Sequence, residues 1–260
     1  MYAMERQTLI EQELVDQGRV SVVSLARRFD VTTETVRRDL AQLESAGALR
    51  RVHGGAVVAE RSSTAETPLA TRMRHAGAAK SAIARRCVEL LPPDFHGSLY
   101  LDAGTTTAAI AAALATRPSG ARPIDIVTHS MALAHALAGA PGIGLTVIGG
   151  RVRGITAAAV GADTVRAIEQ LRPDIAFVGV NGISAGFGLS TPDPDEAAVK
   201  TAIVAAARRT VVAADAGKHG RELLVSFAPL RAVDVLVTDV APAADLAEAL
   251  ADADAEVLVA

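Results

Sequence analysis

The sequence predicts an α/β protein in which a small winged helix-turn-helix domain precedes a larger α/β domain. Residues 1–58 carry helical apolar periodicity that ends in a basic, hairpin-like segment, whereas residues 80–260 alternate short apolar strands with helices. Residues 59–79 mix Ser, Thr, Ala and Arg with Pro68 and show little apolar periodicity. We expect this segment to be a linker that becomes partly helical toward residues 71–75.

The composition suits two compact domains in one chain. The 260 residues are half apolar and 3% aromatic, so short side chains can bring helices close to a sheet. Cys87 is the single cysteine, which excludes an intrachain disulfide and favours a buried, inert thiol. Apolar stretches are interrupted well before about 18 residues and no signal peptide is recognised, so we expect a soluble, reduced, cytoplasmic protein without membrane contact.

Charge is distributed unevenly along the chain. The net charge is −3, which taken alone argues against a nucleic-acid partner. Residues 1–86, however, hold 14 Arg and Lys against 10 Asp and Glu, while residues 87–260 hold 12 against 19. A basic front and an acidic back is the asymmetry expected when only the front contacts phosphates.

Three short helices are expected in the first domain, at residues 5–17, 21–29 and 32–45. Ser21 and Thr32 are placed to cap the second and third helices, and Gly18 and Gly47 follow positions where helices often end. The second and third helices, with the tight turn between them, form a helix-turn-helix at about residues 20–39.

The third helix has one apolar face and one polar face. Val36, Leu40 and Leu43 recur at i, i+4 and i+7 and should face inward. Arg38 lies on the opposite side with Arg37 on its flank, at the end of the helix that enters the major groove in a helix-turn-helix. An arginine pair on a polar face is also commonly just solvated, so periodicity alone leaves DNA binding open.

A basic hairpin is predicted after the third helix. Residues 49–57 read as two short strands around His53-Gly54-Gly55, with Arg50 and Arg51 on the first strand. This pattern is typical of a wing that lies along the phosphate backbone or in the minor groove. The candidate DNA-binding residues are therefore Ser21, Thr32, Thr33, Thr35, Arg37, Arg38, Arg50, Arg51 and His53.

Several spaced segments of this first domain closely resemble the DeoR family of repressors. They are Gly18-Arg19-Val20-Ser21, Leu25-Ala26-Arg27-Arg28-Phe29, Val31-Thr32, Thr35-Val36-Arg37-Arg38-Asp39-Leu40, Leu43-Glu44, Gly47 and His53-Gly54-Gly55-Ala56. Two departures, Thr32 where Ser is usual and Val36 for Ile, are chemically conservative. The resemblance implies that this domain binds DNA.

The larger domain is expected to hold a mostly parallel sheet covered by helices on both faces. Strands are expected near residues 98–101, 124–128, 144–148, 175–179, 210–214, 233–238 and 256–259. Helices are expected near residues 81–91, 106–115, 131–138, 163–171, 195–207 and 243–251. In such sheets a ligand binds beyond the carboxyl ends of the strands.

Small and polar residues follow these strands. The first strand runs through Asp102-Ala103-Gly104 into Thr105-Thr106-Thr107 at the start of a helix, where freed amides and hydroxyls can hold an anion. The other strands end in Thr128-His129-Ser130, Gly149-Gly150-Arg151, Gly179 with Asn181-Gly182, and Asp215-Ala216-Gly217-Lys218. Each segment also has a purely structural interpretation, as a helix cap or a turn. Their convergence at one edge favours a small, polar, anionic ligand.

This domain is similar to the DeoR-type sensor domain, whose fold resembles ribose-5-phosphate isomerase and CoA-transferase-like proteins. The matching segments are Leu101–Thr106, Ile148–Arg151, Val160-Gly161, Gly188–Thr191, Glu196-Ala197 with Lys200, Asp215 with Lys218, and Val237–Asp239. The resemblance implies a phosphorylated sugar or a close metabolite as the effector, with its phosphate on residues 104–106. The effector-binding candidates are Asp102, Gly104, Thr105, Thr106, Thr128, His129, Gly150, Arg151, Asn181, Glu196, Lys200, Asp215 and Lys218. His129 stands where the family usually has Asn, and Ala216-Gly217 replace the commoner serines.

The resemblance implies a repressor of a carbohydrate-metabolism operon that a phosphorylated sugar releases from its operator. We expect a homodimer or homotetramer, because one head makes few base contacts and operator symmetry mirrors protein symmetry. No cofactor, catalytic residue or metal site is expected, since the six histidines are scattered. Two alternatives are a sugar-phosphate isomerase-like enzyme with an attached DNA-binding head, and an interaction module whose winged head binds protein.

Overall fold

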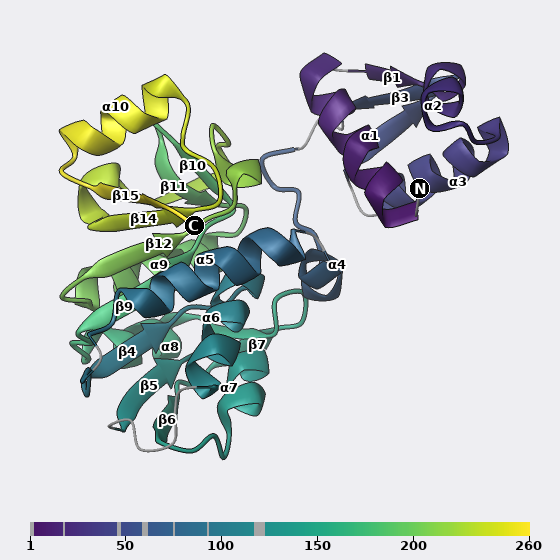
Figure 1. The fold of residues 1–260 in the computed structure, drawn as a ribbon. Helices are drawn as coiled ribbons and strands as arrows, with labels where there is room; N and C mark the ends of the chain where they lie inside the picture. Colours follow the sequence, from purple (N-terminus) through teal and green to yellow (C-terminus); the bar gives the residue numbers. More distant parts are fainter. Residues whose placement is uncertain are drawn as a thin grey trace. The chain divides into compact units, whose positions relative to one another are not determined.

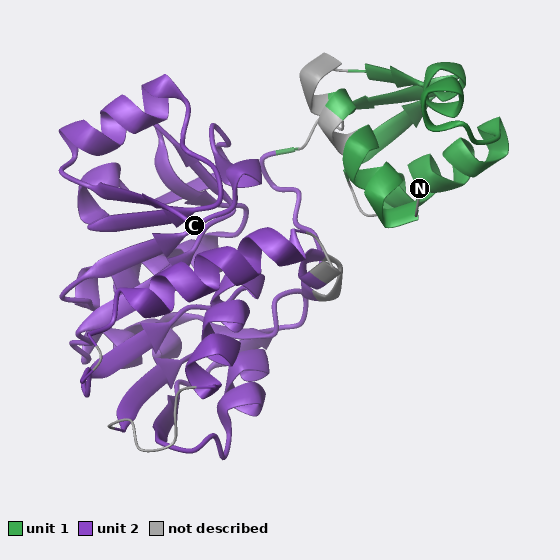
Figure 2. Cartoon of the chain, viewed as in Figure 1, with its two compact units in different colours: residues 1–62 green, residues 63–260 purple. Residues whose placement is uncertain are grey.

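The computed structural model describes residues 3–17, 19–45, 48–58, 62–74, 76–92, 94–116 and 123–260. The chain divides into two compact units, Met1–Ser62 and Ser63–Ala260 (Figure 2). Gly18 and Gly47, expected to end the first and third helices, lie outside the described residues.

Unit 1 is a winged helix-turn-helix. Its elements are α1 (Ala3–Gln17), β1 (Arg19–Ser21), α2 (Val22–Phe29), α3 (Thr33–Ser45), β2 (Leu49–Val52) and β3 (Gly55–Val58). The strands pair antiparallel in the order β1-β3-β2, so Val20, expected to be a short extended link, belongs to the sheet. Gly55 allows this pairing, because a Cβ there would lie 2.0 Å from the Val20 carbonyl oxygen.

The core of unit 1 confirms the predicted apolar faces. Val36, Leu40 and Leu43 of α3 are buried, together with Ile10 of α1 and Leu25 of α2. Thr32 caps α3 as expected, its Oγ1 accepting a hydrogen bond from the Thr35 amide at 3.2 Å. Ser21 occupies the N-cap position of α2, but its hydroxyl makes no capping hydrogen bond, so that part of the prediction is wrong.

One buried ion pair joins α1 to α3. The Arg6 guanidinium contacts Asp39, with Nε at 2.5 Å from Oδ2 and Nη2 at 3.1 Å from Oδ1, and both side chains are less than 10% exposed. Asp39 follows Arg37 and Arg38 in the sequence but faces the core, whereas both arginines are exposed. The ion pair therefore fixes the rotation of α3 and so decides which side chains it presents outward.

Unit 2 is built on a seven-stranded parallel sheet in the order β15-β14-β12-β9-β4-β5-β6 (Figure 1). The strands are β4 (Ser98–Leu101), β5 (Ile124–Thr128), β6 (Ile143–Val147), β9 (Ile175–Gly179), β12 (Thr210–Ala213), β14 (Val235–Thr238) and β15 (Glu256–Val259). The helices are α4 (Leu69–Arg74), α5 (Gly77–Glu89), α6 (Thr105–Ala115), α7 (Met131–Leu137), α8 (Ala162–Glu169), α9 (Pro194–Ala206) and α10 (Ala244–Asp252).

Helices cover both faces of this sheet, as the alternating pattern predicted. Side chains of α5, α6 and α7 pack on one face and those of α8, α9 and α10 on the other. Consecutive strand residues divide between the two cores, so Leu99 and Leu101 join the first while Tyr100 joins the second. No helix among the described residues is long and apolar enough to cross a membrane.

Unit 2 also contains short antiparallel strands outside the seven-stranded sheet, which the sequence analysis did not predict. They are β7 (Arg151–Arg153) with β8 (Ala158–Val160), and the sheet β10-β11-β13 (Gly182–Ser184, Gly188–Thr191 and Val225–Ala228). Two turns of 3₁₀ helix, η1 (Ala216–Lys218) and η2 (Leu230–Ala232), complete the unit. These strands are three or four residues long and β8, β10 and β11 are buried at every position, so they carry no alternating pattern.

The described part of the expected linker contacts unit 2. The Leu224 amide donates to the Ser63 carbonyl at 3.0 Å, and the Leu69 amide donates to the Ile155 carbonyl at 3.0 Å. The expected helical stretch near residues 71–75 corresponds to α4, whose described residues end at Arg74. Residues 63–74 are therefore hydrogen-bonded to the larger unit, while the linker boundaries at 59 and 79 stay a prediction.

The buried ion pair of unit 1 gives a stability prediction. Replacing Asp39 with Ala leaves the Arg6 guanidinium buried without its carboxylate, so we expect the free energy of unfolding of unit 1 to fall by about 2–3 kcal/mol. Urea-dependent hydrogen exchange of α1 and α3 peptides measures this. The matched control is Glu34→Gln in the exposed Glu34–Arg37 pair, which should cost less than about 0.5 kcal/mol. Equal costs for the two variants would contradict the assignment.

Candidate functional site

The first candidate surface lies on α3 and the β2–β3 hairpin of unit 1. Arg37, Arg38, Arg50, Arg51 and His53 are all exposed. Of the remaining predicted DNA-binding residues, Ser21, Thr32 and Thr33 are exposed and Thr35 is half-buried. The Thr32 and Thr35 hydroxyls hydrogen-bond each other at 2.9 Å, so they also serve the start of the helix. The surface offers guanidinium groups from two elements, a helix and a hairpin.

A polar contact holds the hairpin against α3. Glu44, near the end of α3, accepts hydrogen bonds from the Arg51 amide at 2.9 Å and from Arg51 Nε at 2.6 Å. The backbone hydrogen bond, followed by the side-chain one, lowers the pKa of Glu44. Arg51, a candidate for phosphate contact, therefore also connects the hairpin to α3.

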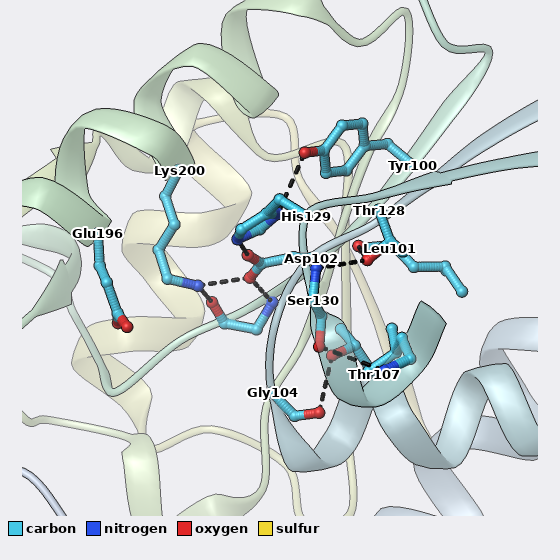
Figure 3. Close-up of polar contacts among 12 residues, drawn as sticks. Tyr100, Leu101, Asp102, Gly104, Thr107, Thr128, His129, Ser130, Glu196 and Lys200 are labelled. Carbon is cyan, nitrogen blue, oxygen red and sulfur yellow. Dashed lines mark hydrogen bonds and ion pairs between the residues drawn. The ribbon is translucent and has the colours of Figure 1, made fainter. Parts of the chain in front are cut away.

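The second candidate site lies at the carboxyl ends of the parallel strands of unit 2. Asp102 follows β4, Gly179 ends β9, and Lys200 lies on α9 (Figure 3). Asp102 is fully buried, forms an ion pair with Lys200, and its Oδ2 accepts a hydrogen bond from the Gly179 amide at 2.9 Å. Lys200 Nζ also donates to the Gly179 carbonyl at 2.8 Å. Two of the predicted effector residues are thus a buried, hydrogen-bonded ion pair.

His129 lies behind this ion pair, deeper in the fold than the sequence analysis expected. Its Nε2 is 3.8 Å from Asp102 Oδ1, and its Nδ1 shares a hydrogen bond of 3.1 Å with the Tyr100 hydroxyl (Figure 3). Burial lowers the pKa of His129 to about 4, against the opposing effect of Asp102 and together with that of Lys200. The imidazole is therefore neutral at neutral pH. Ser130, rather than His129, caps α7, because its Oγ accepts a hydrogen bond from the Leu133 amide.

The second oxygen of Asp102 lacks a hydrogen bond. Among the described residues, Oδ1 is buried with no hydrogen-bond partner, and His129 Nε2 is too distant to supply one. A buried carboxylate oxygen without a donor is costly, so the site is arranged to accept one more donor hydrogen.

The start of α6 lies beside Asp102 in the sequence and leaves amide groups uncapped. Gly104 is the N-cap residue, and no side-chain capping hydrogen bond is made there. The Thr107 hydroxyl donates to the Gly104 carbonyl at 3.0 Å rather than accepting from the first-turn amides. Thr105 is half-buried and Thr106 is buried. Such a helix start, with free amides and the positive end of its dipole, suits an anion.

A cluster of cations surrounds Asp215 and Lys218. Asp215 Oδ1 accepts from the Gly217 amide at 3.1 Å. Burial lowers the pKa of Lys218 to about 8, against Asp215, with Arg221, Lys80 and Arg72 lowering it further. Lys80 also has a lowered pKa, mainly from burial, and its Nζ donates to the Arg72 carbonyl at 2.6 Å. An anion bound here would stabilise the charged form of Lys218 against the neighbouring cations that lower its pKa.

Sequence reasoning missed Arg72 and Lys80 in this cluster. The Arg72 Nε is buried and finds no hydrogen-bond partner within the described part of the chain. A signal was present, because Lys80, Lys200 and Lys218 are the only lysines in the sequence and all of them lie in unit 2 near acidic side chains. Because basic residues in this chain are mostly arginine, the rarity of lysine marks each one as a candidate for a specific contact.

Four further predicted effector-binding residues already have polar partners within unit 2. Glu196 Oε1 accepts from Arg153 Nη1 at 2.8 Å, and Asn181 Oδ1 accepts from the Thr191 hydroxyl at 3.1 Å, so both side chains already have partners. Thr128 donates to the Leu101 carbonyl at 2.7 Å and supports the neighbouring strand. Arg151 is exposed and forms an ion pair with Asp195.

Gly150 has a structural reason of its own. Its φ of +150° is unfavourable for other residues, and a Cβ would lie 2.0 Å from the Thr164 hydroxyl. The Thr164 hydroxyl donates to the Gly149 carbonyl at 2.9 Å, which holds this turn against α8. Gly150 is thus explained without a ligand, and its role in binding stays a prediction.

Known proteins are similar to both units. The family model for the DeoR-like helix-turn-helix domain matches residues 6–62, and that for the DeoR C-terminal sensor domain matches residues 75–240. The glycerol-3-phosphate regulon repressor of Escherichia coli K12 is 31% identical over 97% of this chain and 97% of its own. The HTH-type transcriptional regulator GlpR of Haloferax volcanii is 34% identical over 99% of this chain and 98% of its own. Among solved structures, ribose 5-phosphate isomerase A of Methanocaldococcus jannaschii matches 54% of this chain and 53% of its own, at 16% identity and a TM-score of 0.38.

Burial of His129 predicts a pH dependence of stability. The folded state, with a His129 pKa of about 4, binds fewer protons than an unfolded chain with the ordinary pKa of about 6.5. Stability should therefore fall as pH drops from about 6.5 toward 4, by at most about 1.4 kcal/mol per pH unit from this group.

Urea unfolding of unit 2 at several pH values checks this, with His129→Gln as the comparison. The stability of the variant should depend less steeply on pH. His219, whose pKa is also lowered by burial, is present in both proteins and accounts for part of the remaining dependence. Parallel pH profiles for the two proteins would show that His129 is not held neutral by the fold.

Proposed function

Because the chain belongs to the DeoR family of transcriptional regulators, we propose that it binds operator DNA through α3 and the β2–β3 hairpin and releases it when a phosphorylated polyol or sugar binds unit 2. The family membership makes it a DNA-binding regulator. A role as a repressor, rather than an activator, is supported by the Escherichia coli relative, which is a repressor of a glycerol-3-phosphate regulon.

Exposed guanidinium groups support the DNA-binding role of unit 1. Arg37 and Arg38 project from α3, and Arg50 and Arg51 from the hairpin, while the buried Arg6–Asp39 ion pair fixes the helix behind them. Arginine can contact guanine edges bidentately and can also contact backbone phosphates. Two basic elements on one small unit match a recognition helix with a wing.

The single observation that carries the effector proposal is the buried, unpartnered Oδ1 of Asp102. A ligand hydroxyl could donate to this oxygen, while Lys200 keeps the carboxylate ionised through Oδ2. The uncapped start of α6 is suited to the phosphate of the same ligand. A phosphorylated polyol carries both groups within a few bonds of each other.

The cations around Lys218 supply a second contact region for such a ligand. Lys80 and Arg72 lower the pKa of Lys218, and Arg72 also lowers that of Lys80, so a bound phosphate would relieve this repulsion. Arg72 Nε would gain the acceptor that it lacks. We expect the effector to raise the pKa of Lys218 when it binds.

We expect binding without turnover. Proton transfer beside a carbonyl needs a base that is free to accept a proton at the reacting carbon. The carboxylate of Asp102 is committed to Lys200 and that of Glu196 to Arg153. Fixed ion pairs of this kind position a ligand, which favours a sensor over the isomerase alternative.

We also propose that the regulator works as a homodimer or homotetramer. One recognition helix and one wing contact a short stretch of DNA, and a symmetric pair doubles the contacts on a repeated operator. The effector would then favour one of two arrangements of the assembly and so change operator affinity.

Substitution of the exposed arginines on α3 tests the DNA-binding surface. Arg37→Ala and Arg38→Ala should each weaken operator binding by about 1–3 kcal/mol where the side chain contacts a guanine bidentately. Fluorescence anisotropy with the intergenic fragment upstream of the protein's own gene, at fixed salt, measures the affinity. Arg86→Ala, which removes an exposed arginine from α5 of unit 2, is the matched control. Unchanged affinity in both α3 variants would refute the placement of the recognition helix.

Removal of the Lys218 ammonium tests the effector site. Lys218→Ala should abolish the response of operator binding to a panel of sugar phosphates that includes glycerol 3-phosphate. Operator affinity without ligand should be unchanged, because the substitution leaves unit 1 intact. The same anisotropy assay reports both quantities, and Arg166→Ala on the surface of α8 is the control. A normal response in Lys218→Ala would mean that the site is assigned to the wrong residues.

A further inference from the structure

Residues 63–74, here called the strap, form the start of unit 2 and are hydrogen-bonded to the rest of that unit. The carbonyls of Ser63 and Arg72 accept hydrogen bonds from the Leu224 amide and from Lys80 Nζ, and the Leu69 amide donates to the Ile155 carbonyl. Between these points Glu66, whose side chain is 6% exposed, forms an ion pair of 2.8 Å with Arg153. The strap follows unit 1 directly in the sequence, so its attachment to unit 2 restricts the chain that leads to the DNA-binding unit.

Arg153 is shared between the strap and the start of α9. Its guanidinium lies 2.8 Å from Glu66, 3.1 Å from Asp193 and 2.8 Å from Glu196, and its side chain is 16% exposed. The hydrogen bond that Arg153 donates to Glu66 is the largest cause of its raised pKa. Each terminal nitrogen of this half-buried guanidinium is shared, Nη1 between Glu66 and Glu196 and Nη2 between Glu66 and Asp193, so a shift toward one carboxylate weakens the contact with another.

The start of α9 connects Arg153 to the effector site. Asp193 caps the helix, its Oδ1 accepting from the Glu196 amide at 2.9 Å. Lys200 lies one helical turn after Glu196 and forms the buried ion pair with Asp102. A ligand that contacts Asp102 or Lys200 therefore acts on the turn that holds two of the carboxylates around Arg153.

We propose that Arg153 is a positioning residue that couples the effector site to the strap, by dividing its guanidinium between Glu66 and the pair Asp193 and Glu196. When Arg153 moves toward the α9 carboxylates, its contact with Glu66 weakens and the strap loosens. When Arg153 moves toward Glu66, that contact strengthens and the strap stays bound. This inference rests on the proposed function for its biological meaning, but the coupling itself is a property of unit 2.

Hydrogen exchange of the strap in the full-length, ligand-free protein tests this, because two substitutions should have opposite effects. Glu66→Gln removes the strap's carboxylate and should speed exchange of the Leu69-containing peptide by about tenfold or more. Glu196→Gln removes a competing carboxylate, so Arg153 should bind Glu66 more strongly and exchange should slow several-fold. General destabilisation would speed exchange in both. Arg166→Gln, in an exposed ion pair on α8, is the control and should leave the strap unchanged.

The Arg153→Lys background completes the test. Lysine keeps the charge but loses the fork of donors, so Glu66→Gln and Glu196→Gln should have little further effect in that background. Slower exchange in Glu196→Gln that disappears with Arg153→Lys would establish the coupling. Faster or unchanged exchange in Glu196→Gln, or effects that persist with Arg153→Lys, would overturn it.

Operator affinity of the same variants separates this inference from the proposed function. A loosened strap should resemble the effector-bound state, so Glu66→Gln should weaken ligand-free operator binding several-fold while Glu196→Gln should not. If the wild-type protein bound no operator, the proposed function would fail while the exchange results still decided the coupling. If the operator bound normally and Glu66→Gln left its affinity unchanged despite a loosened strap, the strap would have no part in regulation.

Discussion

The buried ion pair between Asp102 and Lys200 is the constraint on which the rest of unit 2 depends. Two charges removed from water are stabilised here through direct contact and through the amide and carbonyl of Gly179, which ends the neighbouring strand. This requires α9 to lie against the carboxyl ends of β4 and β9. Behind the pair the His129 imidazole is neutral and its Nε2 lies 3.8 Å from Asp102 Oδ1, so Oδ1 has no hydrogen-bond partner among the described residues.

The same ion pair relates the site to the remainder of the chain. Lys200 shares α9 with Glu196, and Glu196 shares Arg153 with Glu66 of the strap that follows unit 1. In unit 1 a second buried ion pair, Arg6 with Asp39, holds α3 so that Arg37 and Arg38 face outward. Both units thus use a buried charge pair to hold a helix that also carries candidate site residues. Breaking either pair would leave an uncompensated buried charge.

The long elements could be predicted from the sequence because each repeats an apolar pattern over several turns or strand residues. The helix expected at 195–207 is α9 at Pro194–Ala206, and the parallel sheet follows from alternating strands and helices. The strands β7, β8, β10 and β11 were missed because they lie outside the alternation of strands and helices from which the parallel sheet was predicted. Asp102 was a candidate because it follows a strand at the carboxyl edge of the sheet, and Lys200 because the DeoR resemblance implied it, but their ion pair was not predicted. The Glu66–Arg153 contact was not, because it joins residues 87 positions apart through tertiary packing alone.

The central claim is that a ligand in unit 2 controls DNA binding by unit 1, and one titration tests it most directly. Purified full-length protein is titrated against the DNA upstream of its own gene at stated salt, with and without individual sugar phosphates, glycerol 3-phosphate among them. The account predicts tight, sequence-dependent binding that one phosphorylated compound releases. Only weak, salt-sensitive, nonspecific binding, accompanied by turnover of a sugar phosphate, would contradict it and favour an enzyme.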